Sequence, residues 1–169
     1  MNIALVSTPW PLYNHPSIQL GALKAYLSLH HVDLRVDAVH GYLEVAESLG
    51  YEAYQTISEK HWLAETVYAA LLLPERIESL GKLFRRLATG KGSLRGVELA
   101  TLAARVQGIT DAVLDRIDWG RYRLIGFSVC LCQVTSSLYF MRQIKRRFPG
   151  VAIVVGGSGF AGTRDRRLF

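Results

Sequence analysis

The residues best suited to bind a ligand lie in a glycine-rich segment, residues 156–162. It contains Gly156, Gly157, Ser158 and Gly159 directly after an apolar run. Because glycine has no side chain, a planar or anionic ligand can come close to the backbone there. We expect a ligand to approach the backbone at Gly157. The substitution Gly157→Val would then abolish ligand binding and leave the stability of the fold little changed. The same glycines are also typical of a simple turn between a strand and a helix, and the segment alone does not decide between the two.

Two further segments with polar and aromatic side chains follow apolar runs at residues 2–7 and 123–129. In an open parallel α/β sheet, ligands bind beyond the carboxyl ends of the strands, close to the point where the strand order reverses. Three segments that each follow a strand would therefore meet at one edge of the sheet. The predicted ligand-binding residues are Ser7, Thr8, Pro9, Trp10, Ser128, Cys130, Gln133, Gly156, Gly157, Ser158 and Gly159. We predict no catalytic residue and no metal ligand.

Several common functional motifs are not found in the sequence. Residues 90–93 (GKGS) lie between helical patterns and lack the spacing of a nucleotide-binding P-loop. The first apolar run is followed by residues 7–11 (STPWP) instead of the Gly-x-Gly-x-x-Gly of dinucleotide-binding Rossmann domains. The five histidines and two cysteines show no four-ligand zinc spacing. The sequence therefore disfavours a P-loop NTPase, a dinucleotide-binding domain and a structural zinc site.

Hydrophobic periodicity predicts an α/β fold. Alternating or continuous apolar runs indicate strands at residues 2–7, 32–39, 123–129 and 151–155, and helical spacing follows the first and third of them. Strands that alternate with helices form parallel sheets. We therefore predict a doubly wound, flavodoxin-like parallel sheet of order 2-1-3-4, with a fifth strand missing or truncated. The uninterrupted apolar character of residues 151–155 also predicts that the last strand is covered on both faces.

Residues 42–118 show helical periodicity. Gly50 interrupts this pattern, and we expect Ser58 to cap a second helix that ends before Pro74. The segment is therefore predicted to be a helical insertion between the second and third strands. Because 169 residues fit a single domain, we assign residues 1–169 to one truncated domain that contains this insertion.

Composition excludes several classes of protein. Half of the residues are hydrophobic and 20% are charged, which is typical of a globular chain and not of a disordered one. No apolar run approaches the roughly 20 residues of a membrane-spanning helix, and no basic segment precedes the first apolar run as in a secretory signal. The net charge of +6 comes from short basic groups typical of solvated helix faces. We therefore expect a cytoplasmic protein without a membrane or nucleic-acid partner.

Several segments of the chain resemble one known family. Residues 2–11 (NIALVSTPWP) and 16–27 (PSIQLGALKAYL) resemble the start of the B12-binding domain of cobalamin-binding radical SAM proteins. Residues 125–130 (IGFSVC) and 154–158 (VVGGS) resemble the third and fourth strands of that domain with their loops. Residues 57–65 (ISEKHWLAE) are similar to the branch that matures ribosomally made peptides. The resemblance covers essentially the whole chain and implies the N-terminal, Rossmann-like domain of such a protein.

The resemblance implies that this domain binds cobalamin, with the upper face of the cofactor turned toward a downstream radical SAM domain of the same polypeptide. S-adenosylmethionine and a [4Fe-4S] cluster would bind only to that downstream domain, because the Cys-x-x-x-Cys-x-x-Cys motif is not found in these residues. The Asp-x-His-x-x-Gly motif that supplies a histidine ligand to cobalt in cobalamin mutases is not found either. We therefore expect a cobalamin-binding module that is not catalytic alone and has no histidine ligand to cobalt.

Two other functions remain open on the sequence. The same fold without a cofactor would serve as a docking module for a substrate or leader peptide, with the basic and aromatic side chains of the insertion as the contact surface. A flavodoxin-like domain that binds a phosphorylated cofactor such as a flavin also fits the predicted sheet. Retained corrin absorption after mixing with hydroxocobalamin would separate the first function from these two.

Overall fold

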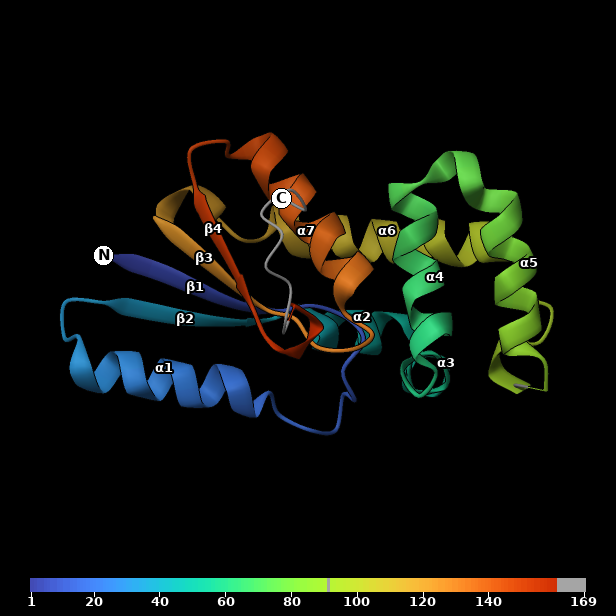
Figure 1. The fold of residues 1–169 in the computed structure, drawn as a ribbon, viewed down its shortest axis with the longest axis horizontal. Helices are drawn as coiled ribbons and strands as arrows, with labels where there is room; N and C mark the ends of the chain where they lie inside the picture. The colour runs from blue at the N-terminus through green and yellow to red at the C-terminus, as the bar shows by residue number, and fades with distance from the viewer. Residues whose placement is uncertain (91, 161–169) are drawn as a thin grey trace.

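The computed structural model describes residues 1–90 and 92–160 and shows an α/β fold around one parallel sheet (Figure 1). Four strands form the sheet in the described residues, in the order β2-β1-β3-β4. The strands are β1 (Asn2–Ser7), β2 (Arg35–His40), β3 (Leu124–Ser128) and β4 (Ala152–Gly156). The predicted doubly wound, flavodoxin-like order is therefore confirmed.

The register of the sheet brings the carboxyl ends of all four strands to one edge. Ser7 at the end of β1 pairs with His40 of β2, and Ser128 at the end of β3 pairs with Gly156 of β4. Since β1 pairs with both β2 and β3, the strand order reverses between β1 and β3. A crevice is expected at such a point, because the connections leave toward opposite faces of the sheet.

Helices cover the two faces of the sheet unequally. Helix α1 (Ile18–His30) packs on one face, where Leu20 joins Ile3, Leu5 and Val36 in a small apolar cluster. The larger core lies on the opposite face, where α2 (Gly41–Leu49) and α7 (Val134–Arg147) pack against the alternate side chains of β1, such as Val6. This alternation follows from the period of two along a strand.

A helical insertion connects β2 to β3 and extends away from the sheet (Figure 1). Its helices are α2 (Gly41–Leu49), α3 (Tyr51–Ser58), α4 (His61–Leu72), α5 (Ile77–Ala88) and α6 (Leu99–Asp115). The insertion was predicted and is confirmed, and Gly50 breaks it as expected with a φ of +96°. Ser58 does not cap a helix, because it ends α3 and its hydroxyl donates to the carbonyl of Gln55 at 3.0 Å. Three helices therefore replace the two expected before Pro74.

One prediction about β4 is wrong. Val154 is 51% exposed, although a strand of this apolar character was expected to be covered on both faces. Ile153 and Val155 pack on the larger core, whereas α1 packs against β1 and β2 and leaves its side of β4 open.

None of the helices in the described residues is long and apolar enough to cross a membrane.

Glu65 of α4 caps the amino terminus of α7. Its carboxylate oxygens accept hydrogen bonds from the backbone N–H groups of Val134 at 3.0 Å and Thr135 at 2.8 Å. Gln133, the residue before α7, makes no capping hydrogen bond with its own side chain. A carboxylate at this position satisfies two orphan N–H groups and interacts favourably with the helix dipole. Glu65 therefore joins the helical insertion to the helix that follows the loop after β3.

We predict that Glu65→Ala lowers the free energy of unfolding by roughly 1–2 kcal/mol, because two N–H groups of α7 lose their acceptor. Urea unfolding of the purified chain measures this change. Glu59→Ala is the control, because Glu59 is exposed and accepts only a surface hydrogen bond from Gln55. Equal losses for the two variants would contradict the capping role.

Candidate functional site

A crevice of about 290 Å³ lies where the strand order reverses. The loop after β1, the start of α1 and the loop after β3 form its walls. Its polar lining comes from Ser7, His15, Ser17, Gln19, Ser128, Cys130 and Gln133. The structure therefore brings together four of the predicted ligand-binding residues, although Ser7 lies 121 positions before Ser128 in the sequence.

An apolar groove of about 450 Å³ continues from this crevice. It runs between α1 and the exposed side of β3 and β4, where Leu20, Leu23 and Leu27 face Val154. Gln19 and Ser128 line both the crevice and the groove, so the two cavities form one continuous site. A polar pocket that continues into an apolar groove is suited to an amphiphilic ligand.

Gly126 in the middle of β3 keeps the apolar groove open. A Cβ atom at this position would lie 3.1 Å from Cδ2 of Leu5 and 3.6 Å from Cγ1 of Val154. Sequence reasoning did not select Gly126, Gln19 or the leucines of α1. An isolated glycine within a strand is a known sign of close approach to a ligand or another chain, so Gly126 was detectable in principle.

The buried side chain of Gln133 holds the two loops of the crevice together. Its Nε2 donates to the carbonyl of Thr8 at 2.6 Å and to Oγ of Ser7 at 3.2 Å. Its Oε1 accepts from the backbone N–H of Cys130 at 3.0 Å. Because these bonds use both ends of the amide, Gln133 fixes the shape of the crevice in addition to lining it.

Thr8, Pro9 and Trp10 lie behind the crevice. The hydroxyl groups of Thr8 and Ser137 are 2.7 Å apart, and Ser136 donates to the carbonyl of Pro9. Trp10 is 1% exposed, and its ring centroid lies 5.0 Å from that of Tyr54 in the core of the insertion. The side chains of Thr8 and Trp10 therefore support the loop from the interior, and their contact with a ligand stays a prediction.

The two cysteines face different surroundings. Cys130 lines the crevice. Cys132 points toward the insertion, where its Sγ lies 3.8 Å from Nδ1 of His61. Burial raises the pKa of Cys132 to about 11, so its thiol is protonated at neutral pH. In the described part of the chain, no group of three or more His, Cys, Asp or Glu side chains could hold a metal ion.

Gly157 lines the apolar groove, but it also has a structural role in the turn after β4, and its contact with a ligand stays a prediction. Its φ is +104°, and a Cβ atom would lie 2.3 Å from the carbonyl oxygen of Val129. The space beside Gly157 is therefore filled by the protein backbone, and this glycine is required by the turn. Gly156 is different, because a Cβ atom there would meet nothing within 4 Å. Ser158 and Gly159 lie in the short helix that follows, where Gly159 N–H donates to the carbonyl of Val129 at 2.9 Å, and Gly162 lies outside the described residues.

We predict that Gly157→Val lowers the free energy of unfolding by about 2 kcal/mol or more, because it combines a strained φ with a backbone clash. Gly156→Val is expected to change it by less than about 1 kcal/mol, since valine suits a strand and finds open space. Thermal or urea unfolding of both variants checks the pair. A fully stable Gly157→Val variant would contradict the structural role of Gly157 in the turn.

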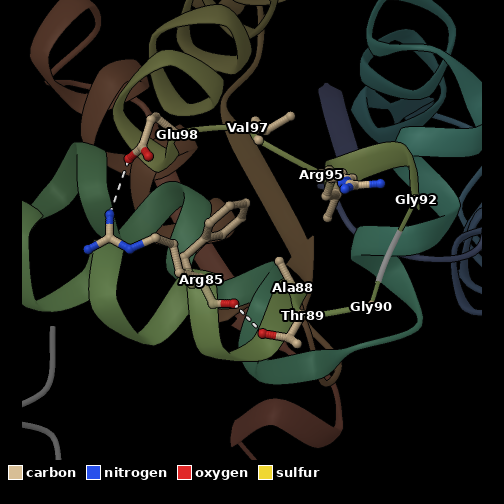
Figure 2. A pocket seen from close by; sticks show the side chains of 11 residues that line it. Arg85, Ala88, Thr89, Gly90, Gly92, Arg95, Val97 and Glu98 are labelled. Atoms are coloured by element: carbon tan, nitrogen blue, oxygen red, sulfur yellow. Dashed lines mark hydrogen bonds and ion pairs between the residues drawn. The ribbon is translucent and has the colours of Figure 1, made fainter.

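A second cavity of about 440 Å³ lies in the insertion, between the end of α5 and the start of α6 (Figure 2). Phe84, Leu94 and Val97 provide its apolar lining. Arg85 donates to Glu98 across its rim at 3.2 Å. Arg95, on the other side, forms no ion pair with any described residue. This cavity therefore combines an apolar surface with an uncompensated cation.

The structure is a doubly wound α/β fold with a crevice at the switch point of its sheet. Comparison with protein-family models, curated proteins and solved structures finds no match. The function proposed below therefore depends on the geometry of the site and on the resemblance seen in the sequence.

Proposed function

We propose that this chain is a cobalamin-binding module of a radical SAM enzyme. The observation that carries the proposal is the continuity of the polar crevice with the apolar groove at the carboxyl edge of the sheet. Cobalamin is itself amphiphilic, since its corrin ring carries amide side chains and its nucleotide tail ends in an apolar dimethylbenzimidazole. The two halves of the site match these two parts of the cofactor in polarity.

The residues present fit such a cofactor. Gly126 leaves a space in the groove that a side chain would fill, and Gly156 faces open space at the carboxyl end of β4. Ser7, Ser128 and Gln19 offer hydrogen-bonding groups to the amides and the phosphate at the crevice. The apolar groove would hold the base and exclude water from it. When bound, cobalamin would supply a cobalt centre that can exchange a ligand.

The proposal includes a second domain that would carry out the catalysis. A downstream radical SAM domain of the same polypeptide would bind S-adenosylmethionine and the [4Fe-4S] cluster, and a peptide would be the substrate. In this proposal, the residues of this chain bind and orient the cofactor at the edge of the sheet. Gln133 and Glu65 keep that edge in place, because they join the loop after β3 to the loop after β1 and to the insertion.

We predict that the purified chain retains corrin absorption bands after it is mixed with hydroxocobalamin and desalted. Gly156→Val is expected to lower the retained fraction at least tenfold, because its side chain enters the site from the groove side of β4. Gly150→Val is the matched control. It lies before the opposite end of the same strand, and its Cβ would also meet nothing within 4 Å.

Two outcomes would contradict the proposal. Absence of corrin bands with the wild-type chain at excess ligand would exclude cobalamin binding by this domain. Equal retention by the wild-type chain and Gly156→Val would place any bound corrinoid outside the described site. Circular dichroism of each variant confirms that the fold is retained.

A second candidate function is the docking of a peptide on the insertion. The cavity beside α5 favours it, because Phe84, Leu94 and Val97 offer an apolar surface next to the uncompensated Arg95. A peptide with apolar and acidic side chains complements this combination.

We predict that Arg95→Glu weakens the binding of a fluorescent amphipathic peptide rich in leucine and glutamate at least tenfold, as measured by anisotropy. Arg142→Glu, an exposed position on α7, is the control with the same change in net charge. Equal binding by both variants would contradict docking at this cavity.

A further inference from the structure

We infer that the outward face of α1 binds the same face of a second copy of this chain, in antiparallel orientation. This face is an apolar stripe of four exposed residues, Ile18, Ala22, Ala25 and Leu29, which we call the α1 stripe. None of the four lines the crevice or the apolar groove. The inference therefore goes beyond the proposed function, because it concerns a surface that the proposed ligand site does not use.

Helix α1 is more exposed to water than its composition predicts. Eleven of its thirteen residues are exposed, and only Leu20 is buried. Lys24 is the single Lys, Arg, Asp or Glu residue of this helix. A surface helix normally carries charged and polar residues on the side turned to water, and a helix that is apolar on all sides is normally buried. A partner that covers α1 would remove this conflict.

The α1 stripe lies on the side of the helix that is turned away from the sheet. Leu20 and Leu27 pack in the small cluster on the sheet, and Ala22 and Leu29 each follow one of these leucines by two residues. Two residues are slightly more than half of a helical turn. Ile18 and Leu29 are accordingly both 76% exposed. Figure 1 shows α1 at the lower margin of the molecule, with no labelled helix or strand below it.

The spacing of the stripe is that of a helix–helix interface. Its residues are separated by four, three and four positions, as apolar residues are along the seam of a coiled coil. This spacing is the same in both directions of the chain, and so is the order of side-chain sizes, which is large, small, small, large. An antiparallel second copy would place Ala22 opposite the partner's Ala25 and Ile18 opposite the partner's Leu29.

This symmetric order favours a second copy over an unrelated partner. A two-fold symmetric interface has to be complementary to itself, and the stripe meets this condition only because its order reads the same in reverse. Two crossed helices are closest in the middle, where the alanines allow close approach, and diverge toward the ends, where Ile18 and Leu29 fill the wider space. Lys24 lines a cavity at the edge of β2 with Asp37 and Arg121, so it lies outside the stripe.

The oligomeric state of the purified chain, measured by sedimentation equilibrium, tests the inference. We expect a weak dimer with a Kd on the order of 10 µM, because one pair of helices buries less surface than a typical stable interface. Ala22→Glu and Ala25→Lys should each raise this Kd at least tenfold, since each places a charge in the apolar stripe. Thr101→Glu is the control, because it makes the same change in charge as Ala22→Glu at an exposed position of α6.

A mixture of the two charged variants tests the antiparallel orientation. Antiparallel pairing brings the introduced glutamate of one chain opposite the introduced lysine of the other. We therefore expect an equimolar mixture of Ala22→Glu and Ala25→Lys to dimerise with a Kd at least fivefold lower than that of either variant alone. A mixture that dimerises no better than the separate variants would overturn the inference.

Three further outcomes would also overturn it. These are a wild-type chain that is monomeric at every concentration, a dimer that Ala22→Glu leaves intact, and a monomeric chain that binds phosphatidylcholine–phosphatidylglycerol vesicles through the stripe. Circular dichroism of each variant confirms that the fold is retained. Because the stripe lies outside the ligand site, Ala22→Glu should retain as much corrin absorption as the wild-type chain. Failure of the dimer is therefore distinguishable from failure of the proposed function.

Discussion

The position of β1 between β2 and β3 is the constraint on which the rest of the structure depends. This strand is buried along nearly its whole length and is hydrogen-bonded on both edges. The chain leaves β1 through α1 on one face of the sheet, whereas α7 follows β3 on the other. The loops after these two strands therefore diverge and leave a crevice between them. Gln133 makes this crevice a fixed shape, because its amide bonds to both loops.

The apolar groove has a different origin from the crevice. It exists because α1 packs over β1 and β2 and leaves its side of β4 open, and because Gly126 places no side chain between them. An exposed Val154 costs solvation free energy in the free protein, since apolar surface remains in water. A ligand or protein segment that covers this surface recovers that free energy. The groove therefore favours binding of an apolar group over an empty site.

Much of the architecture could be predicted from local patterns. Strands β1 and β4 and helix α1 lie where the periodicity of the apolar residues predicted them, and Ser17 caps α1 by accepting a hydrogen bond from the N–H of Leu20. Other boundaries depended on contacts that a pattern does not contain. Val32 fits the alternation of a strand, yet it precedes β2 and is exposed, because Leu34 N–H bonds back to His31 in a turn.

The sequence by itself determined the class of fold, the insertion and the edge of the sheet where the site lies, because periodicity and the rules of parallel connections are local properties. Only the tertiary structure decided what each site residue does. Gly156 and Gly157 are adjacent glycines that the sequence does not distinguish. The backbone of Val129 fills the space beside Gly157 but not the space beside Gly156. Ser7 ends β1 and Trp10 follows three positions later, but only Ser7 reaches the crevice, since Trp10 packs in the core. Such differences arise from segments distant in the sequence, since Val129 lies 28 positions before Gly157 and Tyr54 lies 44 positions after Trp10. No local pattern specifies where these segments lie.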